Sequence, residues 1–177
     1  LSSRPLAALW EDWPTRFITN VSFYLNYRLG RFNPFGYHLV NLLIHAANSV
    51  LLYRLLTVSI SGTAKKGARF FSLPAGAGAV LFALHPVQTQ AVSYIAQRAT
   101  LLATFFYLLA LLGYAWGRKS SRSLFYPAAW LAGFLAMFCK EMAFSLPAAV
   151  ILWELLFGQK GGKAKTRRLI VFSLLFL

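Results

Sequence analysis

The chain has 177 residues, of which 58% are hydrophobic and 16% aromatic, and its 18 lysines and arginines against 4 acidic residues give a formal charge of +14. Intrinsic disorder is excluded because disordered chains combine high charge with low hydrophobicity, and for the same reason we expect no nucleic-acid partner. The composition leaves a membrane protein with basic loops or an unusually apolar soluble domain, and the positions of the charges decide between them.

The first 37 residues are more polar than the rest and are expected to lie outside the membrane. Within them, residues 14–29 predict an amphipathic helix. Its apolar side carries Phe17, Ile18, Val21, Tyr24 and Leu25. Gly30 suits the C-cap of this helix, and the Asn-Pro-Phe-Gly motif at 33–36 predicts a turn.

Long apolar runs follow, and a membrane-crossing helix needs about 20 such residues. The runs occupy residues 38–60, 70–84, 99–117 and 124–157. The final run, residues 169–177, is too short to cross, so we expect the chain to be a fragment of a longer protein, incomplete at both ends.

Basic residues gather in three short segments between these runs, at 63–69, 118–123 and 159–168. Such loops lie on the cytoplasmic side of a membrane. They share one side only if residues 124–157 cross twice, as a hairpin that turns at Lys140 and Glu141. The sequence therefore predicts an all-α polytopic bundle over residues 38–177, with about five full spans and a truncated one, preceded by an extracytoplasmic segment over 1–37.

Polar residues interrupt the first apolar run at His38, Asn41, His45 and Asn48. Their spacing of 3, 4 and 3 places them on one narrow arc of a helix. Polar groups at membrane depth are costly and face the interior of a bundle or a cavity. They could line a cleft for a polar ligand, or they could hydrogen-bond neighbouring helices.

Two further polar segments fall on the predicted extracytoplasmic side. Residues 87–97 predict an interfacial helix that follows His85 and carries Gln90 on its polar side, and Arg98 opens the next span. Arg98 could bind a phosphate with two nitrogens or extend to lipid headgroups. Lys140 and Glu141 could be a phosphate-binding cation with its orienting carboxylate, or a pair that neutralises itself.

Three stretches resemble a known family. They are NPFGYHLVNLLIHAANSVLLYRLL at 33–56, LFALHPVQTQAVSYIAQRATLLATFFYLLALLGY at 81–114 and LAMFCKEMAFSLPAAVILWELLF at 135–157. They resemble the membrane part of TMTC-type proteins, transmembrane proteins followed by tetratricopeptide repeats in the GT-C glycosyltransferase superfamily, and the bacterial members above all. The resemblance implies transfer of a sugar, with mannose as one candidate, from a polyprenyl-phosphate carrier to a protein hydroxyl at the periplasmic face of a bacterial inner membrane.

The resemblance also implies roles for residues. The catalytic acidic pair of the superfamily is expected upstream of this sequence, because Glu11 and Asp12 do not match its position. Gln90 stands where the family's His-Pro loop usually has a glutamate. The residues expected to bind the lipid phosphate or the substrate are His38, Asn41, His45, His85, Gln90, Arg98, Lys140 and Glu141.

No metal-binding residues are predicted, and the sequence leaves open whether a divalent metal is required. The polyprenyl-phosphate-linked sugar is expected as the donor substrate. The other expected partners are membrane lipid and a protein acceptor. Two alternative functions remain open at this stage. One is a non-catalytic membrane anchor for the repeats, and the other is part of a transporter, whose broken helices would resemble the predicted hairpin.

Overall fold

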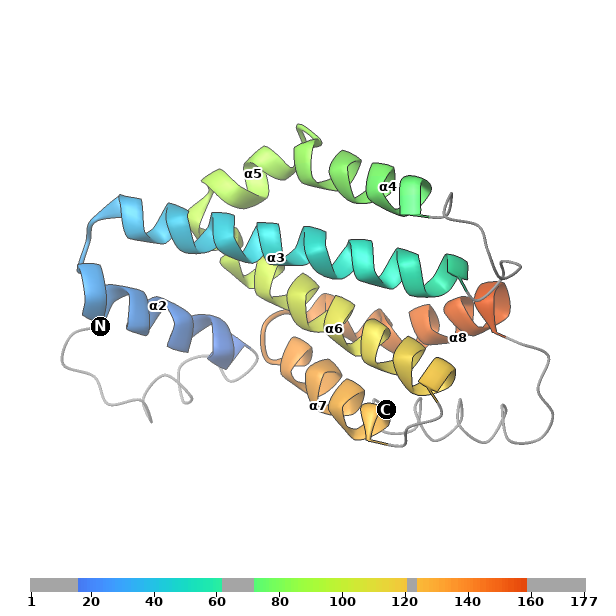
Figure 1. The fold of residues 1–177 in the computed structure, drawn as a ribbon. Helices are drawn as coiled ribbons and strands as arrows, with labels where there is room; N and C mark the ends of the chain where they lie inside the picture. The colour runs from blue at the N-terminus through green and yellow to red at the C-terminus, as the bar shows by residue number, and fades with distance from the viewer. Residues whose placement is uncertain (1–15, 62–71, 121–123, 159–177) are drawn as a thin grey trace.

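The computed structural model describes residues 16–61, 72–120 and 124–158, and this part of the chain is helical without any strand (Figure 1). Its α-helices are α2 (Phe17–Gly30), α3 (Pro34–Ser61), α4 (Ser72–Leu84), α5 (Gln88–Ser93), α6 (Arg98–Ser120), α7 (Phe125–Met137) and α8 (Leu146–Phe157). Short 3-10 segments, η3 (Ile95–Gln97) and η4 (Glu141–Ser145), precede α6 and α8. The all-α prediction is confirmed for these residues. Glu11 and Asp12, the basic residues at 63–69 and 160–168, and the run at 169–177 lie outside them.

Two helices in the described part are long and apolar enough to cross a membrane, over Pro34–Ile60 and Ile95–Ser120. They contain the predicted spans 38–60 and 99–117. The other predicted crossings form shorter apolar helices, α4, α7 and α8, of 13, 13 and 12 residues. At 1.5 Å per residue these are about 18–20 Å long, against about 30 Å for a bilayer core. The described residues therefore contain two candidate spans, and the predicted five full spans are not confirmed.

The junction between α2 and α3 differs from the predicted turn. The chain reverses at Arg31, whose φ of 50° lies in the left-handed region. Asn33 Oδ1 accepts a hydrogen bond from the backbone nitrogen of Phe35 at 3.1 Å, and Pro34 is the first residue of α3. This is the arrangement of an N-cap followed by proline. The Asn-Pro-Phe-Gly motif thus begins a helix, because Asn and Pro suit a helix start as well as a turn.

The predicted break at Lys140 and Glu141 is present. α7 ends at Met137 and α8 begins at Leu146, while Lys140 between them has extended backbone. Both arms lie along α6, and the start of α7 and the end of α8 meet the same end of α6 (Figure 1). Residues 124–157 therefore form a hairpin of two helical arms, not one continuous helix.

Small residues bring α6 and α7 close together. A Cβ atom added at Gly113 would lie only 3.2 Å from the Cβ of Ala129. Ala110, Ala129 and Ala132 are buried in the same cluster. Small side chains allow helix backbones to approach closely, which is typical of helix packing in membranes. Since α6 also packs against α3, it holds the hairpin and the first long helix in one unit.

The most buried residues of α2 are polar, not apolar. The helix is present, but its buried residues are Thr19 and Asn26. Leu25 and Leu29, by contrast, are 56% and 91% exposed. Thr19 and Asn26 face the bundle, where they have hydrogen-bond partners, while Phe17, Ile18, Val21 and Tyr24 of the predicted apolar side are half-buried.

The two ends of the bundle differ in chemistry. α3, α6 and α8 end at the same end of the bundle, and α4 and α7 begin there (Figure 1). The three basic segments of the sequence connect to the helices at this end, which we call the basic end. The opposite end holds α2, the α4–α5 turn, the first turn of α6 and the α7–α8 turn. We call it the polar end.

Candidate functional site

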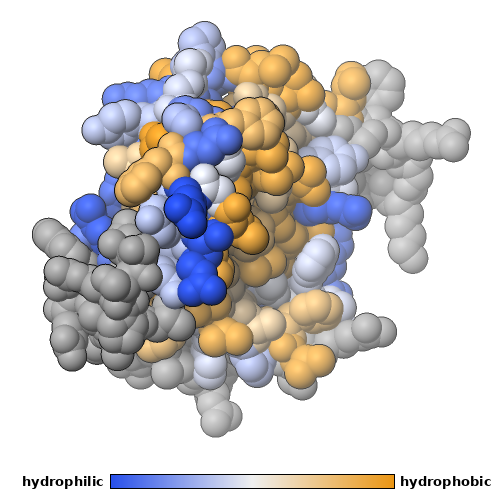
Figure 2. Space-filling view, turned by 90° about the vertical axis from the view of Figure 1, so that its left-hand side faces the viewer, coloured by the Kyte–Doolittle hydropathy of each residue, from blue (hydrophilic) through white to orange (hydrophobic). Residues whose placement is uncertain are grey.

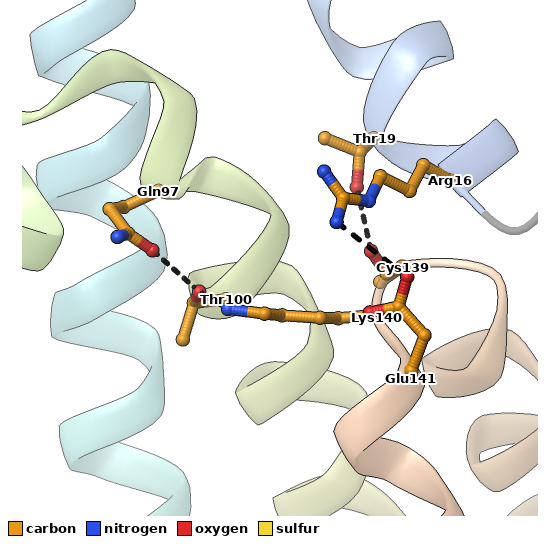
Figure 3. Close-up of polar contacts among 7 residues, drawn as sticks. All are labelled: Arg16, Thr19, Gln97, Thr100, Cys139, Lys140 and Glu141. Atoms are coloured by element: carbon orange, nitrogen blue, oxygen red, sulfur yellow. Dashed lines mark hydrogen bonds and ion pairs between the residues drawn. The ribbon is translucent and has the colours of Figure 1, made fainter. Parts of the chain in front are cut away.

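The polar end holds a chain of hydrogen bonds that ends on a lysine (Figure 3). Lys140 Nζ donates to Thr100 Oγ1 at 2.8 Å, and the Thr100 hydroxyl donates to Gln97 Oε1 at 2.7 Å. Lys140 thereby reaches from the α7–α8 turn to the first turn of α6. An ammonium group has three N–H donors, and within the described residues only one of them is used. The other two are available to a ligand.

Glu141 does not contact the Lys140 ammonium in the described part of the chain. Its carboxylate pairs with Arg16 at 3.6 Å, and the two side chains are 56% and 45% exposed. Thr100, not Glu141, therefore fixes the position of the lysine. The ion pair instead joins the beginning of α2 to the α7–α8 turn, in line with the bonds from Ile18 N to Phe138 O and from Thr19 Oγ1 to Cys139 O.

We expect Glu141 to stay ionised in mild acid. A hydrogen bond from its own backbone N–H, with the charge of Arg16 as a smaller cause, lowers the pKa of this carboxyl below its ordinary value. A lowered pKa favours the folded contact above the unfolded value of about 4.3, and this contribution is lost as the pH falls through the folded value. NMR titration of the labelled carboxyl checks this. A midpoint at or above the ordinary value, or no upward shift in Arg16→Gln, would contradict it.

Arg98 is fully buried and is engaged by the protein itself. Its four hydrogen bonds end on Asn41 Oδ1, Asn26 Oδ1 and Tyr37 O, each at 2.9 Å, and on Ser22 O at 3.4 Å. The guanidinium also lies over the ring of Phe23, 4.6 Å from its centroid. Since a guanidinium has five N–H groups, little of it is left for a phosphate. The geometry gives Arg98 a positioning role that joins α2, α3 and α6.

The charge of Arg98 is not neutralised by its contacts. All four hydrogen-bond acceptors are neutral oxygens, and the described residues hold no carboxylate paired with it. Arg98 lies two residues before Thr100, the partner of Lys140. In a medium of low dielectric constant, an uncompensated cation favours an anion nearby. The polar end therefore presents positive potential around the lysine.

The polar residues of α3 hydrogen-bond neighbouring helices. Asn41 Nδ2 donates to Val92 O at 3.3 Å and Asn48 Nδ2 to Leu101 O at 3.1 Å. His45 Nε2 lies 3.1 Å from Ala83 O, so this nitrogen carries the proton of the neutral ring. Each bond reaches a different helix. Of the two interpretations of this arc, the structure shows interhelical hydrogen bonding for these three residues.

His38, His85 and Gln90 lie at the periphery of the polar end and are exposed. His85 Nδ1 accepts a bond from Val87 N at 3.2 Å, which supports the start of α5. α5 ends at Ser93, because the backbone at Tyr94 is extended, so the helix predicted over 87–97 is broken. No contact in the described part of the chain joins these three residues to Lys140. The predicted set therefore divides into Lys140 at the site, Glu141 paired with Arg16, these three peripheral residues, and a group bonded within the bundle that comprises Asn41, His45 and Arg98.

Comparison with known proteins adds to this geometry. No family model matches the chain, and no solved structure matches it. Among curated proteins, the chain is 33% identical to human protein O-mannosyl-transferase TMTC4 over 86% of its length and 24% of that protein. It is also 33% identical to Tmtc3 of Drosophila melanogaster, over 78% of the chain and 17% of that protein. It is 40% identical to mouse TMTC2, over 55% of the chain and 10% of that protein. Its homologues are TMTC-type protein O-mannosyl-transferases.

The TMTC-type similarity agrees with the family resemblance of the sequence, and it covers only part of each relative. The chain spans about a quarter of TMTC4 and less of the other two relatives. These relatives are animal proteins, so they do not support the predicted bacterial origin. Together with the two apolar helices, they indicate a membrane protein.

The structure adds site residues that the sequence did not single out. Thr100 and Gln97 hold Lys140, and Asn26 accepts a bond from Arg98. A signal for Asn26 was present, since Thr19, Ser22 and Asn26 follow a spacing of 3 and 4 that puts them on one helix face. The residues described include no group of three His, Cys, Asp or Glu side chains that could hold a metal ion. Figure 2 views the polar end, where hydrophilic side chains lie in a patch bordered by apolar ones.

Proposed function

We propose that this chain is part of an integral-membrane O-glycosyltransferase that moves a sugar, mannose being the candidate, from a polyprenyl-phosphate carrier to a protein hydroxyl. The names of the TMTC-type relatives support the class of reaction. Two candidate spans support a membrane setting. The polyprenyl carrier, the protein acceptor and the periplasmic side of a bacterial inner membrane are parts of the proposal that rest on the sequence resemblance.

In this proposal Lys140 binds the phosphate of the carrier. Transfer breaks the bond between the anomeric carbon of the sugar and a phosphate oxygen, so negative charge develops on the departing phosphate. A cation fixed beside that oxygen stabilises this charge. The observation that carries the assignment is the 2.8 Å bond from Lys140 Nζ to Thr100, which holds the ammonium in place at the polar end.

Other residues have supporting roles in the proposed transfer reaction. Arg98 adds positive potential and positions α2 without touching the substrate. His38, His85, Gln90 and Glu141 border the same end and are proposed to contact the sugar or the acceptor. The acceptor hydroxyl must lose a proton as the new bond forms, and we propose that an acidic pair upstream of this sequence takes it. Residues 1–37 and 38–177 are proposed to be the extracytoplasmic segment and the membrane bundle.

The test is Lys140→Met in the full-length protein. Removal of one fixed donor to a developing oxyanion lowers the rate about 100-fold, so we expect a loss of that size in transfer of labelled sugar from polyprenyl phosphate to acceptor protein. Lys140→Arg, which keeps the charge, should retain a larger part of the rate. Arg28→Gln is the control, because it removes an exposed cation from α2.

Two outcomes would contradict the proposal. One is a Lys140→Met enzyme, present in the membrane at normal amounts, that transfers sugar within about twofold of the wild-type rate. The other is a wild-type protein without any transfer activity, which would favour the membrane-anchor alternative.

A further inference from the structure

The basic end holds a pocket between the ends of α3, α6 and α8, at the opposite end of α6 from Lys140. Its volume is about 80 Å³. Arg118 and Lys119 of α6 line it together with Ser59 of α3 and Trp153 and Phe157 of α8. Two cations and two aromatic rings therefore border one small cavity. The transfer reaction proposed above makes no use of this cavity.

The guanidinium of Arg118 is held in place through its Nε and Nη2 atoms. Glu154, which is fully buried, accepts from Arg118 Nε at 3.1 Å and from Nη2 at 2.7 Å, and the Tyr114 hydroxyl donates to the same carboxylate at 3.1 Å. In the part of the chain that the structure describes, Nη1 of Arg118 has no hydrogen-bond partner. A guanidinium fixed in this way presents its remaining N–H groups without further loss of side-chain entropy.

Lys119 adds a charge that Glu154 does not offset. Its Nζ donates to Val58 O at 3.3 Å, which brings the ammonium to the end of α3 beside the pocket. Among the described residues at this pocket, the two cations Arg118 and Lys119 stand against the one carboxylate of Glu154.

The remaining walls are apolar and belong to the membrane interface. Trp153 Nε1 donates to Ser59 Oγ at 2.8 Å, and the ring of Trp153 contacts that of Phe157. On α8 beside them, Leu152, Leu155 and Leu156 are 57%, 71% and 62% exposed. Tryptophan next to basic residues and exposed leucines is the pattern of the boundary between headgroups and acyl chains.

We propose that this pocket binds the phosphate of an anionic phospholipid, with its acyl chains along the exposed leucines of α8. Arg118 Nη1 and Lys119 Nζ are the donors to the phosphate oxygens. Free phosphate would satisfy the same donors, but it would leave the apolar wall of α8 without a partner. Basic pockets between membrane helices bind anionic headgroups for this reason.

The experiment uses the full chain in nanodiscs made of equal parts phosphatidylcholine and phosphatidylglycerol, and native mass spectrometry counts the lipids that stay bound. Wild type should retain phosphatidylglycerol in preference to phosphatidylcholine. Lys119→Gln should lower that retention about fivefold, and Lys119→Arg should keep it. Arg28→Gln, which removes the same charge at the polar end, should retain as much as wild type.

Three results would overturn the proposal. Wild type could retain the two lipids equally. Lys119→Gln and Arg28→Gln could lower retention to the same extent, which would indicate a general effect of charge. Excess inorganic phosphate could displace the phosphatidylglycerol completely, which would indicate a site for free phosphate. None of these results bears on sugar transfer, so this inference and the proposed function fail separately.

Discussion

Replacement of Arg98 by methionine is expected to lower the free energy of unfolding by about 3–5 kcal/mol and to release α2 from the bundle. The methionine fills similar space but donates no hydrogen bond. Four buried oxygens, two from asparagine side chains and two from the backbone, then lose their donor. Interhelical hydrogen bonds in membranes contribute about 0.6–2 kcal/mol each, so the loss of four corresponds to about 2–8 kcal/mol, a range that contains the expected cost.

Hydrogen exchange of the α2 amides measures this release directly. In Arg98→Met these amides should exchange faster, while the amides of α6 and α7 keep their protection. Arg98→Lys should be intermediate, because an ammonium cannot reach acceptors in the planar fork of a guanidinium. Arg28→Met is the matched control on α2, since Arg28 is exposed. Unchanged protection of α2 in Arg98→Met would show that α2 is held by other contacts.

Release of α2 should also disturb the lysine site. α2 is tied to the α7–α8 turn by the bonds from Ile18 and Thr19, and Lys140 directly follows the residues that accept them. In the proposed function, stability and the binding of the carrier phosphate by Lys140 are therefore linked through one buried cation. A variant of Arg98 would lose transfer activity through the position of Lys140, without any contact between Arg98 and the substrate.

The features that the sequence predicts well are those encoded locally. The length of an apolar run indicates a helix, and Lys140 and Glu141 in the middle of one such run indicate a break because charges do not lie unpaired among apolar helices. The break and the hairpin are both present. The shared side of the basic segments follows from the same pattern of charge, and the helices that flank these segments meet at one end (Figure 1).

The features that the sequence misses depend on distant contacts or on the solvent. The partners of Arg98 lie 57 to 76 positions away, so no local pattern connects them. In water the apolar face of a helix turns inward, and that rule alone does not place Thr19 and Asn26 among the buried residues of α2. Lipid offers no hydrogen bonds, so a helix at the edge of a membrane bundle turns its polar side to the protein instead. Thr19 and Asn26 follow that second rule.

The basic end is held together by a buried ion pair, and Glu154→Leu is expected to cost about 3–5 kcal/mol of unfolding free energy. The leucine leaves the guanidinium of Arg118, only 18% exposed, without its carboxylate. The hydroxyl of Tyr114 also loses its acceptor. Thermal unfolding of the full chain in nanodiscs measures the loss. Arg118→Met should cost a similar amount, because it removes both guanidinium hydrogen bonds from the fully buried carboxylate of Glu154.

The double variant Glu154→Leu, Arg118→Met tests whether the cost of each single variant comes from the buried charge that is left without its ion-pair partner. A buried ion pair loses much of its Coulombic gain to desolvation, so replacing both partners with apolar side chains is often close to neutral. We therefore expect the double variant to recover most of the stability that either single variant loses. If instead the two costs add, the two residues are not coupled, and each stabilises the fold through its other contacts. Recovery would leave Glu154 with a different role, which is to hold the Arg118 guanidinium in place at the mouth of the lipid pocket.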